Sequence, residues 1–312
     1  MSRSSAPITA AMSAIKTEPA GSGKNSVEIL SGFRSGLDET EKFLYALSDG
    51  NVVEGVLLRY PHGDNLCVST QVGCRMGCVF CASTLNGLVR NLTPEEMAGQ
   101  IEAVNRLLLE WDTRRRVHNI VLMGSGEPLD NYENVMSFLR SVSDPDGIGL
   151  PLRQIALSTC GLAERIRSFA KEGLPVHLCL SLHAPNDEIR RRLMPSAAAN
   201  SYEELLAACR YYADHTGRRV TMEYALIRDV NSGVRHAEEL AWRLHGMNCH
   251  VNLIPLNSVT ERELYPPKRE TVEAFRACLR SRGVSVTVRR ELGADIEGAC
   301  GQLRRKILGI DA

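Results

Sequence analysis

The chain carries no excess charge of either sign. Its 312 residues include 37 Lys plus Arg and 37 Asp plus Glu, so the overall charge gives no support to a nucleic-acid partner. Only local basic runs could form a surface for nucleic acid, and arginine runs on helices are more often solvated surface. These runs lie at residues 114–116, 190–192, 218–219, 289–290 and 304–306.

Long apolar runs and an export signal are also missing. No apolar stretch approaches the roughly 20 residues of a membrane-spanning helix, and the N-terminus lacks the features of a signal peptide. Residues 1–25 are rich in Ser, Ala, Gly and Pro without apolar periodicity, which predicts a disordered tail. Ten cysteines without an export signal indicate a reducing compartment, the cytoplasm, and sulfur used for metal or redox chemistry. We expect no membrane partner.

What the sequence does contain is an alternation of strand-like and helix-like segments. Residues 26–60 predict a short N-terminal extension, formed by a short amphipathic helix and a lead-in strand, and residues 61–312 predict repeated strand–helix units. Strands such as "VHLCLSLH" and "VTMEYALI" are near-continuous apolar runs, typical of a parallel sheet. One helix should begin at Pro94, with Thr93 as its N-cap. We therefore predict an α/β fold, a full or partial barrel with its chemistry at the carboxyl ends of the strands.

Four of the cysteines lie between residues 67 and 81. Cys74, Cys78 and Cys81 follow a C-x3-C-x2-C spacing, and Cys67 precedes them by seven residues. A structural zinc site needs four ligands and would require Cys67 to join. A four-iron cluster held by three cysteines leaves one iron open, where the amino and carboxylate groups of S-adenosylmethionine (SAM) can bind. Phe80, directly before the third cysteine, favours this radical-SAM interpretation over zinc or a plain electron-transfer cluster.

A glycine turn, "GSGEP" at residues 124–128, follows the next predicted strand. Its glycines would let the backbone approach a ligand closely, and Glu127 could accept a hydrogen bond from a ligand ammonium. An ordinary tight turn before a helix has the same appearance, so this motif alone is weak evidence.

Six motifs occur together in one order: "CVSTQVGCRMGCVFC", "GSGEPLDNY", "LSTCG", "LSLHAPND", "NLIPLN" and "GADIEGACGQL". From about residue 45 to its end, the chain resembles the radical-SAM adenine methyltransferases of RNA, the RlmN/Cfr family. The resemblance implies a partial (β/α)6 barrel, one [4Fe-4S] cluster, two SAM molecules per turnover and methylation of adenine at C2 or C8, with C2 favoured. It also implies 23S ribosomal RNA as the substrate, transfer RNA as a further one, and an electron donor such as flavodoxin or ferredoxin.

The resemblance also assigns roles to residues of these motifs. The cluster ligands match Cys74, Cys78 and Cys81. The SAM contacts match Gly126, Glu127, Ser158, Ser181, Leu182, His183 and Asn257. The cysteine that is methylated during turnover matches Cys300, its partner cysteine matches Cys67, and the proton acceptor matches Glu54.

The chemistry implied by the family explains why two cysteines are needed beyond the cluster ligands. Adenine C2 is electron-poor and cannot attack a sulfonium methyl group directly. The resemblance implies that the Cys300 thiolate takes a methyl group from one SAM, and that a radical made from a second SAM activates this group for addition to the base. After a base removes the ring proton, Cys67 attacks the sulfur of Cys300, which releases the product and leaves a transient disulfide. Cys67 should therefore face Cys300 rather than bind iron.

The N-terminal part departs from the family pattern. Members usually carry a helical accessory domain before the barrel, whereas only about 50 residues precede Glu54 here, so we expect most of that domain to be missing.

Two other interpretations of the function stay open. One is a C-methylase of the same mechanism that acts on a small molecule or peptide. The other is a non-catalytic metal-binding module with Cys67 as a fourth ligand beside Cys74, Cys78 and Cys81.

Overall fold

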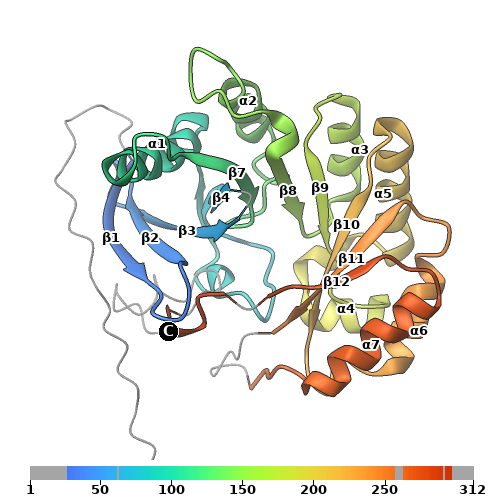
Figure 1. Cartoon of the computed structure of the whole chain (residues 1–312). Coiled ribbons are helices and arrows are strands. Elements are labelled where there is room, and N and C mark those ends of the chain that lie inside the picture. The colour runs from blue at the N-terminus through green and yellow to red at the C-terminus, as the bar shows by residue number, and fades with distance from the viewer. Residues whose placement is uncertain (1–26, 62, 257–262, 291, 297–312) are drawn as a thin grey trace, which may run out of the picture.

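The computed structural model describes residues 27–61, 63–256, 263–290 and 292–296. Within them, one ten-stranded sheet runs in the order β1-β2-β3-β4-β7-β8-β9-β10-β11-β12, flanked by helices (Figure 1), and β5 pairs with β6 in a separate small sheet. The strands are β1 (Glu28–Arg34), β2 (Glu41–Ala46), β3 (Val52–Tyr60), β4 (Gly63–Cys67), β5 (Gln71–Gly73), β6 (Leu88–Asn91), β7 (Val117–Leu122), β8 (Ile155–Thr159), β9 (His177–Ser181), β10 (Val220–Leu226), β11 (Cys249–Pro255) and β12 (Val286–Val288).

Six strand–helix units build the parallel part of the sheet in the described ranges. Strands β4, β7, β8, β9, β10 and β11 pair in parallel and in this order, and β12 adds a further parallel strand. The sheet order ends at β1 and β12, so the barrel is partial, which confirms the predicted fold class. The helices are α1 (Pro94–Trp111), α2 (Tyr132–Val142), α3 (Ala163–Lys171), α4 (Asp187–Leu193), α5 (Tyr202–Thr216), α6 (Val234–Arg243) and α7 (Arg269–Ser281).

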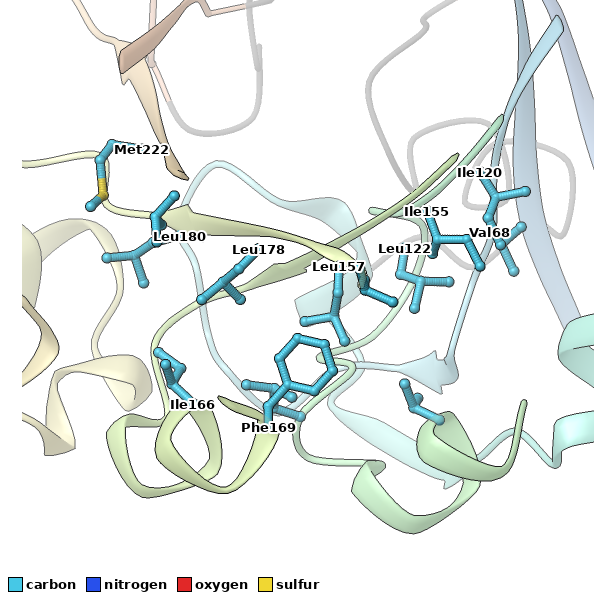
Figure 2. Close-up of a cluster of buried hydrophobic side chains, with 14 of the residues drawn as sticks. Val68, Ile120, Leu122, Ile155, Leu157, Ile166, Phe169, Leu178, Leu180 and Met222 are labelled. Carbon is cyan, nitrogen blue, oxygen red and sulfur yellow. The ribbon is translucent and has the colours of Figure 1, made fainter. Parts of the chain in front are cut away.

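The parallel strands have two unlike faces. Their outer face is aliphatic and packs beneath the helices, because every second residue of a strand points the same way. Figure 2 shows this core, with Leu157, Leu178, Leu180 and Met222 from the strands and Phe169 from α3 among its side chains. The alternate residues form the inner face, which is more polar and includes Ser158, Ser181, Glu223 and Asn252.

The N-terminal part is a β-hairpin rather than the predicted short helix. β1 and β2 pair antiparallel, with Gly32 opposite Phe43, and β2 then pairs with β3. Along β2, Phe43 and Tyr45 belong to the main core, whereas Leu44 between them belongs to a separate cluster on the other face. The predicted helix was wrong because this segment alternates with the two-residue period of a strand. The lead-in strand predicted within residues 26–47 corresponds to β2, and β3 follows it where a further strand, "NVVEGVLLRY", was predicted.

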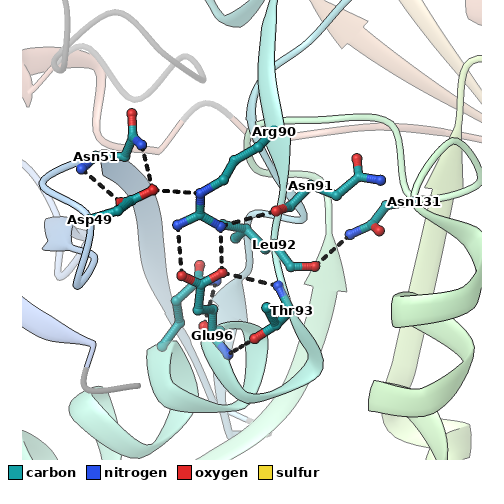
Figure 3. Close-up of polar contacts among 9 residues, drawn as sticks. Asp49, Asn51, Arg90, Asn91, Leu92, Thr93, Glu96 and Asn131 are labelled. Carbon is teal, nitrogen blue, oxygen red and sulfur yellow. Dashed lines mark hydrogen bonds and ion pairs between the residues drawn. The ribbon is translucent and has the colours of Figure 1, made fainter. Parts of the chain in front are cut away.

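The start of α1 confirms the predicted N-cap. The Thr93 hydroxyl accepts from the Glu96 backbone N–H at 3.2 Å, the Glu96 carboxylate accepts from the Thr93 N–H at 3.0 Å, and Pro94 is the first helical residue. Arg90 of β6 donates to both oxygens of this carboxylate at 2.8 Å and to Asp49, in the β2–β3 turn, at 2.6 Å (Figure 3). The β5–β6 hairpin, which encloses the cysteine motif, is thereby held against α1 and the N-terminal strands.

Candidate active site

Cys74, Cys78 and Cys81 lie in the loop between β5 and β6, just beyond the end of β4. The Cys74 N–H donates to the Gly87 carbonyl at 3.0 Å, on the far side of this loop. The Thr84 hydroxyl donates toward the carbonyls of Cys78 at 3.1 Å and Cys81 at 2.8 Å. Hydrogen bonds to the backbone therefore shape the loop, and none of its three cysteines is in a disulfide.

A cluster of buried, mainly apolar side chains, here called the cluster pocket, packs together with the three cysteines. It is formed by α4 and by residues beyond the carboxyl ends of β8 to β11. These residues are Cys160, Ala184, Ile189, Leu193, Met194, Ile227 and Leu256. Burial raises the pKa of Cys74 to about 12 and also raises the pKa of Cys78. Both thiols are thus protonated until a metal takes the place of the proton.

Three cysteines can bind a four-iron cluster, or a single zinc ion when a fourth ligand joins them. The described residues contain no three His, Cys, Asp or Glu side chains that are close enough together to hold one metal ion. A zinc site places all its ligands about 2.0–2.3 Å from one centre. Each thiolate of a four-iron cluster binds a different iron atom, so the three sulfurs stand farther apart.

The glycine turn after β7 packs closely on the chain that leads to the cysteines. Gly126 has a φ of 111°, a conformation that favours glycine, and a Cβ at this position would lie 2.7 Å from the backbone nitrogen of Gln71. A Cβ on Gly124 would lie 2.7 Å from the backbone nitrogen of Ser69. The sequence predicted that the backbone of this turn approaches a ligand closely, and within the chain its close neighbours are Ser69 and Gln71, the first residue of β5.

Glu127 is buried beneath this turn, and its carboxylate is engaged by backbone groups. One oxygen accepts from the Cys160 N–H at 2.7 Å, and the other accepts from the Leu129 N–H at 3.0 Å. Burial raises the pKa of this carboxyl group. Although we predicted an acceptor for a ligand ammonium, these contacts show that the carboxylate joins the turn after β7 to the end of β8.

The structure brings Ser158 and Ser181 together. They occupy the inner face on neighbouring strands β8 and β9, and their hydroxyl oxygens are 3.3 Å apart. Leu182, the next predicted SAM contact, has its side chain fully buried in the main core. The side chain of Leu182 is therefore not open to a ligand, and in its backbone the N–H donates to the Glu223 carbonyl at 3.0 Å and the carbonyl accepts from Arg190 at 2.7 Å.

His183 connects this strand end to the cysteine loop. It has a φ of 54°, and its Nδ1 accepts from the Ala225 N–H at 2.9 Å. The Phe80 ring packs edge-on against the imidazole, with 4.9 Å between ring centroids. Burial lowers the pKa of His183 to about 3, so the imidazole is neutral near pH 7. Asn231, which motif reasoning missed, fixes this bend by donating to the His183 carbonyl at 2.7 Å.

Arg190 corrects an expectation drawn from the basic runs. The run at residues 190–192 was expected to be solvated surface, and its second and third residues are exposed, but Arg190 is fully buried. A signal for this exists in the sequence, because Arg190 shares one stripe of α4 with Ile189 and Leu193. That stripe faces the cluster pocket.

Cys67 lies apart from the other three motif cysteines. It ends β4 and packs in a different buried cluster, together with Val56 and Leu292. Cys67 is paired with Val56 of β3, and Glu54 lies two residues before Val56 on the same face. The carboxylate of Glu54 is 3.5 Å from Nζ of Lys42, and both side chains are buried. The structure thus brings Cys67 close to Glu54 and keeps it out of the cluster pocket.

The last described residues are fastened to the N-terminal hairpin. The Asp295 carboxylate accepts from the Ser35 hydroxyl at 2.6 Å and from the Gly36 N–H at 2.7 Å. The Gly293 N–H donates to the Asp38 carboxylate at 2.8 Å. We call these contacts the C-terminal anchor, because they tie residues 292–296 to the β1–β2 turn, beside the cluster that contains Cys67.

Two predicted site residues lie outside the described residues. They are Asn257, a predicted SAM contact, and Cys300, the predicted methylated cysteine. In the sequence, Cys300 follows Asp295 by five residues. The predicted tail, residues 1–25, also lies outside the described residues.

Comparison with known proteins agrees with this arrangement. The family model of the radical SAM superfamily matches residues 68–241. A protein of Alkaliphilus oremlandii named probable dual-specificity RNA methyltransferase RlmN is 52% identical over 274 residues, which cover 88% of this chain and 78% of that protein. One of Lachnospira eligens with the same name is 49% identical, over 88% of this chain and 77% of that protein. The chain belongs to the radical SAM superfamily and, within it, to the RlmN family.

Solved structures place this RlmN-family chain in the same fold. A radical SAM methyltransferase from Sphaerobacter thermophilus is 44% identical, with a TM-score of 0.86, over 89% of this chain and 81% of that one. SuiB from Streptococcus suis, solved with S-adenosylmethionine, is 12% identical with a TM-score of 0.53 and shares the fold alone.

As a radical SAM protein of this family, the chain uses a [4Fe-4S] cluster and SAM. Within its described part, no helix has the length and apolar character to cross a bilayer.

Proposed function

We propose that this protein is an RNA methyltransferase that adds a methyl group to C2 of adenine. Its relatives at about half identity are named dual-specificity RNA methyltransferase RlmN, and we propose 23S ribosomal RNA and transfer RNA as its substrates. One observation supports this function most directly. The motif cysteines are divided between two buried clusters, one that holds Cys74, Cys78 and Cys81 and one that holds Cys67.

We assign the ligation of the cluster to Cys74, Cys78 and Cys81. Their loop is shaped by its own backbone, and the side chains packed around them are mainly apolar. When bound there, the cluster supplies the electron that cleaves SAM and generates a radical. The electron would come from a one-electron carrier such as flavodoxin or ferredoxin. The residues around the cysteines keep water away, which protects a radical from quenching.

We place SAM over the carboxyl ends of β7 to β11. The turn at Gly126 offers backbone groups to it, and the paired hydroxyls of Ser158 and Ser181 can bond to ribose or amino acid oxygens. Glu127 contributes by holding the turn in place. The full proposed set is Gly126, Glu127, Ser158, Ser181, Leu182, His183 and Asn257.

The transfer of the methyl group is assigned to the hairpin side of the site. Cys300 would accept the methyl group as a thiolate and carry it to the base. Glu54, on the same face as Cys67, would accept the ring proton, and Cys67 would form the disulfide that releases the product. The C-terminal anchor supports this assignment, because it brings the chain leading to Cys300 to the neighbourhood of Cys67 and Glu54.

Mass spectrometry of RNA nucleosides tests the proposed function. Ribosomal and transfer RNA from cells with and without the gene would be digested and compared for 2-methyladenosine and 8-methyladenosine. We expect 2-methyladenosine to depend on the gene. Unchanged nucleosides in both RNA classes would contradict the proposal and leave a small molecule or peptide as the substrate.

A further inference from the structure

Arg190 of α4 is a buried cation whose hydrogen bonds to oxygen all go to backbone carbonyls. Its Nη1 donates to the carbonyls of Ser181 at 2.9 Å and Leu182 at 2.7 Å, and its Nη2 donates to the carbonyl of Cys160. Its Nε is buried and has no partner. The guanidinium thus clasps the carboxyl ends of β8 and β9, the two strands that carry Ser158 and Ser181.

No carboxylate among the described residues forms an ion pair with Arg190. The carboxylate of Glu127 and the guanidinium of Arg190 are separated by one residue, Cys160. The Cys160 N–H donates to Glu127, and the Cys160 carbonyl accepts from Arg190. Met194 contributes its Sδ, 3.5 Å from Nη1. The ionisable groups with the largest effect on the pKa of the guanidinium are three thiols and a phenol, namely Cys160, Tyr202, Cys78 and Cys209.

Burying a charge without a counter-charge is costly. Arginine cannot avoid this cost, because its guanidinium keeps its proton in proteins. The three carbonyls accept from three of the five N–H donors of Arg190 and carry no negative charge, and its Nε has no partner. A fold that retains such a cation is complete only when an anion occupies a neighbouring site.

The cluster pocket is the neighbouring site that would receive an anion. Met194, in contact with Arg190, belongs to the same buried cluster of side chains as Cys74 and Cys78. The backbone N–H of Val79, next to Cys78, donates to the carbonyl of Leu193 in α4 at 2.9 Å. The core of an oxidised [4Fe-4S] cluster carries two positive charges against the three negative charges of its thiolates. Its net charge is therefore −1, and reduction makes it −2.

We infer that Arg190 supplies the counter-charge for the iron–sulfur centre and thereby makes its one-electron reduction easier. The physical reason is that a nearby positive charge stabilises the form with the extra negative charge, and net charge is one of the factors that set the potential of such centres. Arg190 acts as a positioning residue as well, since its clasp orders the strand ends beneath SAM. This inference rests on the proposed ligand role of Cys74, Cys78 and Cys81.

Redox titration of the reconstituted cluster, followed by electron paramagnetic resonance, tests the inference. Wild type would be compared with Arg190→Met and Arg190→Gln, which remove the charge, and with Arg190→Lys, which keeps it. For the two neutral variants, we expect the ratio of reduced to oxidised cluster at a fixed potential to fall about tenfold, which equals 59 mV for a one-electron couple. For Arg190→Lys, we expect a potential near that of wild type, although the variant loses the planar clasp and melts earlier.

Arg191→Met is the matched control. Arg191 is the next residue of α4 and is exposed, so the same loss of charge is screened by water and salt and should leave the potential unchanged. A fall in potential that is equal in Arg190→Lys and Arg190→Met would overturn the inference, because geometry and not charge would then be responsible. Equal potentials in wild type and both neutral variants would overturn it as well.

A second pair of variants keeps the test decisive if the neutral Arg190 variants do not fold. Met194→Glu places a carboxylate beside the guanidinium and cancels its charge, and Met194→Gln has the same shape without the charge. We expect a lower potential in Met194→Glu than in Met194→Gln, and equal values would overturn the inference. A wild-type chain that takes up no four-iron cluster would instead overturn the proposed function.

Discussion

Lys42 and Arg190 are both fully buried cations, yet they stand in opposite settings. Lys42, on the hairpin side of the site, has the carboxylate of Glu54 at 3.5 Å. Arg190, on the cluster side, donates to carbonyls and has no carboxylate partner in the described part of the chain. The hairpin side therefore has a counter-charge in direct contact with its buried cation, whereas Arg190 on the cluster side contacts no carboxylate, and we infer that the bound cofactor supplies its counter-charge.

The two sides of the site therefore balance the charge of a buried cation in different ways. On the hairpin side, charge is balanced within the polypeptide, so stability there should not depend on iron. On the cluster side, we infer that the bound iron–sulfur cluster balances the charge. The effect of a mutation there on stability should therefore depend on whether the cluster is bound. Variants on either side can sharpen this comparison or break it.

The largest expected effect is that of Lys42→Met. It removes the cation that lies 3.5 Å from the buried Glu54 carboxylate, and breaking a buried pair in this way costs about 3–5 kcal/mol. Urea unfolding, followed by circular dichroism, would measure the free energy of unfolding with and without the reconstituted cluster. We expect the same loss in both forms.

The double variant Lys42→Met with Glu54→Leu serves as the control for this prediction. It removes both charges, so we expect it to recover most of the stability while the methyltransferase activity stays lost. If Lys42→Met lowered the stability of the cluster-loaded form alone, the proposed independence of the two sides would be refuted.

The next effect concerns His183 on the cluster side and appears as a dependence on pH. Unfolded His183 binds a proton below about pH 6.5, whereas its pKa in the folded protein is lowered to about 3 by burial. The unfolded state thus binds more protons between these values, and stability falls as the pH falls through this window, by up to about 1.4 kcal/mol per pH unit.

His183→Asn should remove this part of the pH dependence, since asparagine does not titrate and tolerates a positive φ. Urea unfolding of both proteins between pH 7.5 and 4.5 would measure the two slopes. Parallel pH profiles would show that His183 titrates normally and is not buried neutral beside Phe80.

The smallest effect is expected at the C-terminal anchor. Asp295→Asn keeps one acceptor but loses the charge that holds Ser35 and Gly36, which should cost about 1 kcal/mol. Amide hydrogen exchange should become faster at Gly36, and the loss of stability should again be independent of iron. Asp214→Asn changes an exposed aspartate of α5 and is the control. If the amide of Gly36 exchanged at the same rate in Asp295→Asn as in wild type, Asp295 would not hold the β1–β2 turn.

Much of the fold could be predicted because its signals are local. Apolar strand runs that alternate with helical spacing gave the strand–helix units, and Thr93 with Pro94 marked the start of α1. The hairpin β1–β2 was missed because its seven-residue and six-residue strands are short, so their alternation competes with a helical interpretation. Its pairing partners are set by the three-dimensional fold and not by local spacing.

The residues of the site also fall into a group that the sequence predicted and a group that it did not. The cysteine spacing and the motifs named nearly all candidate residues, and the structure brings Ser158 close to Ser181 and Cys67 close to Glu54. Arg190 and the backbone contacts of Glu127 could not be found by motif. Whether an arginine in a run of three is buried depends on which stripe of the helix meets the rest of the protein, and that is decided by tertiary packing.

The division of labour among the cysteines is tested most directly by Cys67→Ala and Cys78→Ala, reconstituted side by side. For each protein, iron content and the yield of 2-methyladenosine would be measured. We expect Cys67→Ala to bind as much iron as wild type while it forms no methylated product, and Cys78→Ala to lose both. If Cys67→Ala lost its iron as Cys78→Ala does, Cys67 would be a ligand and the account would be contradicted.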